Sequence, residues 1–137
     1  RDHLHLIVEA ADRDALARGM QGLLSGLARV INAATGCAGK VWNDRYHARA
    51  LATPRAVRTC LVYVMRNGRK HGETAAAVDP FSSGAWFDGF AEHGPLRADA
   101  PPCHPASVWL LTTGWKRAGG PIRAHESPVA PQGAPGP

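Results

Sequence analysis

The sequence predicts an α+β domain, and a few stretches in its first half support that prediction. Residues 1–9 alternate in character, with the odd positions from His3 to Glu9 on one face and Leu4, Leu6 and Val8 on the other. A period of two is typical of a half-buried β-strand. Amphipathic helices are expected over residues 13–35 and 54–69. A bent strand or tight strand pair is expected between them, over residues 41–51.

Both helices have terminal signals. Asp12 is placed to cap the first, Gly36 ends it, and its apolar residues recur at three- and four-residue steps, which predicts packing in a core. Thr53 and Pro54 begin the second with a hydroxyl cap followed by a proline at the first helical position.

Composition limits the classes of function. The chain of 137 residues suits one domain, and its net charge of +5 favours an anionic partner such as nucleic acid. Its three cysteines include no Cys-x-x-Cys pair, which argues against a disulfide framework or zinc knuckle and favours a reducing, cytoplasmic setting. No apolar run is long enough to predict a membrane span.

Basic residues gather on two predicted surfaces. Arg45, His47 and Arg49 share one face of residues 41–51, either as a solvated face or as a surface for a phosphate backbone. The second helix is expected to expose further cations, namely Arg55, Arg58, Arg66, Arg69 and Lys70.

The rest of the chain is predicted to be less regular. Residues 1–75 form one expected domain, which the family resemblance described below makes a partial catalytic domain, and residues 76–118 an accessory segment. Phe81, Trp86, Phe87 and Phe90 are expected to lie back on the domain, residues 107–115 to form a short helix, and residues 119–137 to be disordered. For Trp86 and Trp115, filling a core edge is favoured over stacking on bases.

Two pairs of side chains suggest chemistry. His3 and His5 lie two residues apart on one predicted strand face, a spacing that lets two imidazoles share one metal ion. Tyr63 and Asn67 lie one helical turn apart, at the edge of the buried helix face.

These pairs, with the segments between them, resemble a known family. The matching stretches, in order, are His3-Leu4-His5-Leu6-Ile7-Val8, Val41-Trp42-x-x-Arg45-Tyr46-His47, Tyr63-Val64-Met65-Arg66-Asn67 and Arg66-Asn67-Gly68-Arg69-Lys70-His71-Gly72. They are similar to those of the HUH-type single-tyrosine transposases, and more closely to the REP-associated tyrosine transposases of bacteria. The resemblance covers residues 1–72 well and 79–117 loosely.

The resemblance implies a fold and an activity. The fold would be a ferredoxin-like antiparallel sheet with helices on one face, its N-terminal strand–helix–strand missing from this chain. The activity would be cleavage and strand transfer of single-stranded or hairpin DNA through a 5′-phosphotyrosine intermediate. Tyr63 would be the nucleophile and His3, His5 and Asn67 the ligands of Mg²⁺ or Mn²⁺. Arg45, His47, Arg49, Arg66, Arg69 and Lys70 would contact DNA.

Alternatives stay open on the residues alone. One is a DNA-binding relic of a transposase that has lost turnover, and another is a small metal-dependent hydrolase that uses His3, His5 and His47. The expected partner is DNA rather than a membrane, and both a monomer and a homodimer are compatible with the sequence.

Overall fold

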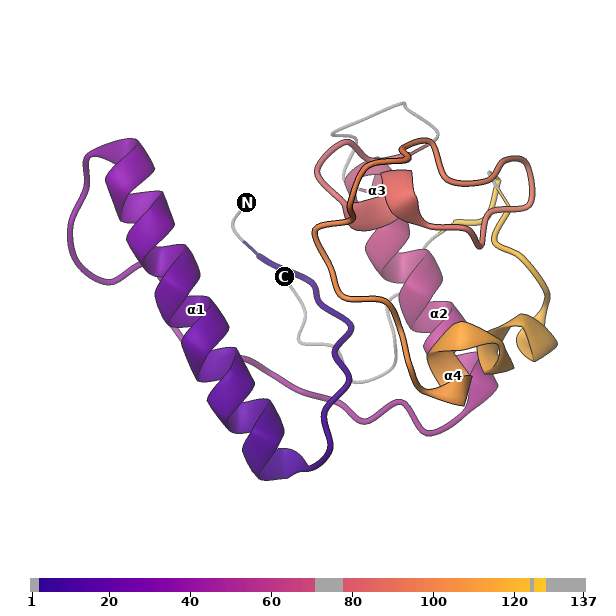
Figure 1. Cartoon of the computed structure of the whole chain (residues 1–137), viewed down its shortest axis with the longest axis horizontal. Helices are drawn as coiled ribbons and strands as arrows, with labels where there is room; N and C mark the ends of the chain where they lie inside the picture. The colour runs from indigo at the N-terminus through magenta and orange to yellow at the C-terminus, as the bar shows by residue number, and fades with distance from the viewer. Residues whose placement is uncertain (1–2, 71–77, 124, 128–137) are drawn as a thin grey trace. The chain divides into compact units, whose positions relative to one another are not determined.

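The computed structural model describes residues 3–70, 78–123 and 125–127, and these are helical rather than α+β (Figure 1). The α-helices are α1 (Arg13–Thr35), α2 (Pro54–Met65), α3 (Asn67–Lys70) and α4 (Trp109–Thr112), and the 3₁₀ helices are η1 (Ser83–Trp86) and η2 (Gly114–Ala118). Within the described ranges there is no strand, and β-pairing is limited to one parallel bridge between Phe90 and Ile122. The predicted α+β fold with a ferredoxin-like antiparallel sheet is therefore wrong.

The two predicted strands lack pairing partners. Residues 3–10 and 45–52 have no regular secondary structure. A strand needs a neighbour that satisfies its backbone N–H and C=O groups, and the described part of the chain supplies none. The alternation in the sequence therefore reports which side chains share a face, and it does not ensure a sheet.

The described residues divide into two compact units. Residues 8–50 form one, called here the α1 unit, and the described residues among 1–7 and 51–137 form the other, the α2 unit. No helix among the described residues has the length and apolar character needed to cross a bilayer.

In the α1 unit, the predicted helix is confirmed. The Asp12 side chain accepts a hydrogen bond from the amide of Ala15 at 2.6 Å, and Gly36 ends the helix in the left-handed region with a φ of 67°. Residues 37–50 fold back on α1, because the Trp42 indole donates to the Leu24 carbonyl at 2.9 Å.

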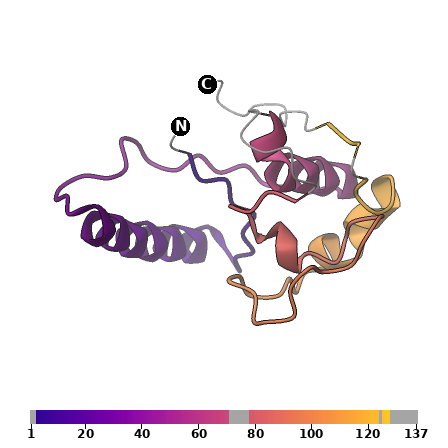
Figure 2. The ribbon, with the colours of Figure 1, turned by 90° about the horizontal axis from the view of Figure 1, so that it is seen from above.

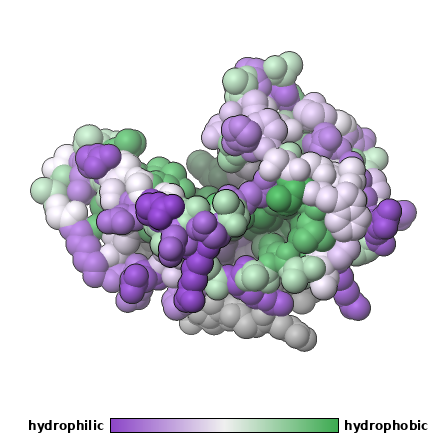
Figure 3. All heavy atoms as spheres, turned by 60° about the horizontal axis from the view of Figure 1, so that its bottom comes forward, coloured by the Kyte–Doolittle hydropathy of each residue, from purple (hydrophilic) through white to green (hydrophobic). Residues whose placement is uncertain are grey.

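The apolar stripe of α1 is not a core in this unit. Met20 is the buried residue of α1, whereas Leu23, Val30 and Ile31 are exposed. Apolar surface is visible on α1 at the left of Figure 3. The predicted stripe is therefore only partly buried, with Leu16, Leu24 and Leu27 at intermediate exposure, because amphipathic spacing defines a face but does not provide a packing partner.

The core of the α2 unit forms along α2. The Thr53 hydroxyl accepts a hydrogen bond from the Ala56 amide at 3.2 Å and Pro54 begins the helix, as the sequence predicts. The buried core consists of Val57, Leu61, Val62, Met65, Phe90, Trp115 and Ile122. Figures 1 and 2 show α4 and η2 beside α2, and the three helices contact one another.

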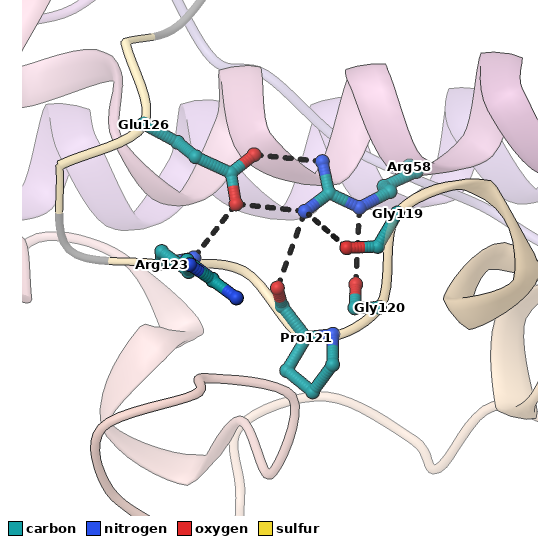
Figure 4. A network of polar contacts seen from close by, with 6 residues as sticks. All are labelled: Arg58, Gly119, Gly120, Pro121, Arg123 and Glu126. Carbon is teal, nitrogen blue, oxygen red and sulfur yellow. Dashed lines mark hydrogen bonds and ion pairs between the residues drawn. The ribbon is translucent and has the colours of Figure 1, made fainter.

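A polar network joins residues 119–126 to α2 (Figure 4). Arg58 donates to both carboxylate oxygens of Glu126 at 2.7 Å and to the carbonyls of Gly120 and Pro121 at 3.0 and 3.2 Å. These hydrogen bonds hold the pKa of the Glu126 carboxyl below its ordinary value. The structure thus differs from the predicted disorder for residues 119–123 and 125–127, because Arg58 donates hydrogen bonds to three of their carbonyls and to the Glu126 side chain, and Ile122 enters the core. Residues 124 and 128–137 of that prediction lie outside the described residues.

Candidate functional site

The N-terminal segment places its histidine face against α2. The rings of His5 and Tyr63 meet edge to face with centroids 5.1 Å apart, and His3 meets His5 with centroids 5.8 Å apart. Ile7, on the same face, packs against the core, whereas Leu4 and Leu6 on the opposite face are 48% and 41% exposed. The alternation in the sequence is therefore real, because His5 and Ile7 are half-buried on one face, although His3 at its start is exposed.

Tyr63 has this position because of its place on α2. The helix buries Leu61, Val62 and Met65, and Tyr63 lies half-buried on the flank of that face. A helical rotation of 100° per residue leads to the same placement from sequence. Tyr63 therefore has its ring against the His5 ring at the edge of the core.

Asn67 follows a break in the helix. α2 ends at Met65, Arg66 has a φ of −122°, and Asn67 begins α3, so the predicted continuous helix to residue 69 is interrupted at Arg66. The Oδ1 atom of Asn67 is buried and has no hydrogen-bond partner among the described residues. A buried amide oxygen without a partner is costly, and a bound cation would satisfy it.

The predicted DNA-contacting residues belong to two different units of the chain. Arg45, His47 and Arg49 are exposed in the α1 unit. Arg66 was expected on the exposed side of the helix but is only 2% exposed, because the turn after Met65 rotates it toward the interior. The side chains of Arg69 and Lys70 lie outside the described residues.

The metal-ligand set has two imidazoles and an amide. The described residues contain no group of three His, Cys, Asp or Glu side chains placed to hold a metal ion, and His47 belongs to the α1 unit. The rings of His3 and His5 are neighbours, with centroids 5.8 Å apart and planes 76° apart. Carbonyl oxygen is a ligand type that suits Mn²⁺, and the buried Asn67 Oδ1 is such an oxygen without a hydrogen-bond partner among the described residues.

The sequence reasoning missed a turn beside this site. The Asp79 carboxylate accepts hydrogen bonds from the amide of Gly68, directly after Asn67, at 3.2 Å and from the amide of Phe81 at 2.8 Å. Asp79-Pro80 is a turn signal that could have predicted the local conformation. Its attachment to Gly68 depends on tertiary packing, and the Arg58–Glu126 pair was missed for the same reason.

Comparisons with protein-family models, with curated proteins and with solved structures found no match to the chain.

Proposed function

We propose that this protein cleaves and transfers single-stranded DNA, with Tyr63 as the nucleophile. The observation that supports the proposal is the ring contact between His5 and Tyr63, because it joins the histidine pair to a tyrosine far away in the sequence.

The proposed reaction exchanges one phosphodiester for another. The Tyr63 oxygen attacks the scissile phosphorus and forms a bond to it, while its hydroxyl proton passes to solvent. The bond from phosphorus to the 3′ oxygen breaks, and that oxygen takes up a proton. The products are a 5′-phosphotyrosine and a free 3′-hydroxyl. A 3′-hydroxyl of another strand reverses the same step, releases Tyr63 and joins the strands without an external energy source.

His3, His5 and Asn67 are the residues that would hold a divalent ion, Mg²⁺ or Mn²⁺. When bound, such an ion neutralises charge on the phosphoryl oxygens as a Lewis acid. Such an ion would act close to Tyr63, because the ring of His5, one of the two proposed histidine ligands, packs directly against the Tyr63 ring. The chain's contribution is to hold the phenol beside the two imidazoles, so that the nucleophile and the scissile phosphate meet in a defined geometry.

A DNA-binding protein without turnover is the second candidate. Three basic side chains, Arg45, His47 and Arg49, are exposed on a segment that belongs to a different unit from Tyr63. With a net charge of +5, a chain that exposes the Arg45 and Arg49 guanidiniums suits binding to a phosphate backbone whether or not Tyr63 reacts.

The test is capture of DNA by the full chain. End-labelled hairpin DNA with single-stranded flanks is incubated with protein and Mn²⁺ and resolved on a denaturing gel. We expect a protein-linked band that disappears with EDTA and in Tyr63→Phe. Tyr46→Phe, a change at the only other tyrosine in the chain, is the matched control and keeps the band.

Two outcomes contradict the proposal. A covalent band that survives in Tyr63→Phe excludes this tyrosine as the nucleophile. No band from the unchanged protein, with DNA still shifted on a native gel, favours the binding protein instead.

A further inference from the structure

Phe81 is the most exposed large apolar residue of the described chain. Its side chain is 96% exposed, so the prediction that it lies back on the domain is wrong, whereas Phe87 and Phe90 do lie on the core, beside Trp115. An exposed phenylalanine on a mobile loop would call for no explanation, since single apolar residues are common on surfaces. The turn that holds Phe81 is well fixed.

Several hydrogen bonds define that turn. The Asp79 carboxylate accepts from the Phe81 amide at 2.8 Å, and the Asp79 carbonyl accepts from the Ser82 amide at 3.1 Å and from the Ser82 hydroxyl at 2.8 Å. The Ser82 hydroxyl in turn accepts from the Gly84 amide at 3.1 Å. The backbone of Phe81 therefore has little freedom, although its ring projects into solvent.

Both sides of the turn are attached to the end of α2. Gly84 is buried so closely that an added Cβ would lie 2.9 Å from Val78 and 3.7 Å from Met65 of α2. On the other side, Asp79 accepts from the amide of Gly68, the residue after Asn67. The ring is thus presented by the same helix end that carries the candidate site.

The distance to the site is short on the scale of a nucleic acid strand. With consecutive Cα atoms about 3.8 Å apart and a hydrogen bond from Gly68 to Asp79, the backbone of Phe81 lies within roughly 16 Å of Asn67. A few nucleotides of a single strand cover that distance, at about 3.4 Å per stacked nucleotide.

We propose that Phe81 is a stacking residue for one nucleobase of the single strand that flanks the scissile phosphate. The inference rests on the proposed function, because it takes single-stranded DNA as the ligand. An isolated ring among Asp79, Ser82 and Ser83 suits a base better than a protein partner, since protein interfaces need a continuous apolar patch. Stacking is also tolerant of sequence, because every base presents a π-face.

The experiment uses the full chain with Tyr63→Phe as background, so that binding is measured without cleavage. Hairpin DNA carries one 2-aminopurine, moved through successive positions of the single-stranded flank. Phe81 is expected to quench fluorescence at one position, and the quenching is lost in Phe81→Ala. The Kd for this DNA rises by about 5- to 150-fold, the range that loss of one stacked base predicts.

Three further variants sharpen the test. Phe81→Tyr keeps an aromatic face and should retain both the quenching and the affinity. Phe81→Leu keeps apolar bulk without a π-face and should lose the quenching. Leu96→Ala changes another exposed apolar residue of the α2 unit, whose amide donates to the Ala85 carbonyl in η1, and should leave both measurements unchanged.

The inference is overturned if Phe81→Ala binds within about twofold of the background protein, or if Phe81→Leu behaves like phenylalanine. These failures are distinct from failure of the proposed function. Covalent capture by Tyr63 with no effect of Phe81→Ala removes only the stacking role. Quenching that depends on Phe81, with no covalent band from the unchanged protein, removes only the catalytic role.

Discussion

Replacing Glu126 by Gln should weaken the attachment of residues 119–126 to α2. The carboxylate accepts hydrogen bonds from both terminal nitrogens of Arg58 at 2.7 Å and from the Arg123 amide at 2.8 Å. Hydrogen bonds to charged groups contribute about 1.5–3 kcal/mol each when well shielded from water. The side chains of Arg58 and Glu126 are 13% and 23% exposed, so solvent reduces that contribution.

The expected loss is therefore about 1.5 kcal/mol in the free energy of unfolding at pH 7. Gln has the same shape as Glu and retains one acceptor oxygen. Arg58 also retains its hydrogen bonds to the carbonyls of Gly120 and Pro121, so its charge is not left without a partner. Urea denaturation followed by tryptophan fluorescence measures the loss, because Trp115 is buried in the same unit. Asp88→Asn, which neutralises an exposed carboxylate elsewhere in that unit, is the matched control.

The effect should depend on pH in one direction. Because the pKa of Glu126 is lowered in the folded protein, chiefly by its hydrogen bonds to Arg58, the ionised pair stabilises the fold fully above the unfolded pKa of about 4.3. That stabilisation is lost as the pH falls through the folded pKa. The difference between Glu126→Gln and the unchanged protein should accordingly shrink below about pH 4. Equal stability at pH 7, or a difference that is the same at pH 3, would refute this reasoning.

The remaining predictions concern a close contact and the metal site. Gly89→Ala should destabilise the fold by about 1–3 kcal/mol, because the added Cβ would lie 2.7 Å from the Trp115 ring, whereas Gly94→Ala, with open space around it, should be neutral in the same urea titration. Asn67→Ala should weaken Mn²⁺ binding at least tenfold in calorimetry, because the change removes the buried oxygen donor. Asn32→Ala in α1 is the control and should leave the affinity unchanged. Equal Mn²⁺ affinity in Asn67→Ala and the unchanged protein would show that Asn67 is not a ligand.

Local signals predicted the helices well. Asp12 and Thr53 cap α1 and α2, and each helix begins where its cap predicts. A cap acts through hydrogen bonds to amides only a few residues away, so its effect can be inferred from a short stretch of sequence. The same helical spacing placed Tyr63 on the flank of the buried face, and the alternation of residues 3–9 placed His3 and His5 on one face.

The strands could not be predicted in the same way. Alternation over residues 3–9 is typical of a strand, but strand formation depends on a neighbour for the backbone, and within the described residues there is none. The resemblance to a transposase family also implied a sheet, and that prediction was wrong because the described residues supply no neighbouring strand. The α1 stripe shows a related limit, because its spacing defines an apolar face without saying what covers it.

By itself, the sequence determined the two long helices, the pairing of His3 with His5 on one face, and the position of Tyr63 at the edge of a core. Tertiary structure decided that the histidine face turns toward Tyr63, that Arg66 is buried while Phe81 is exposed, and that Arg58 holds residues 119–126. The physical reason is the distance along the chain over which each interaction acts. Capping and periodicity act within one or two turns of chain, whereas burial and long-range hydrogen bonds depend on which distant segments compete for the same surface.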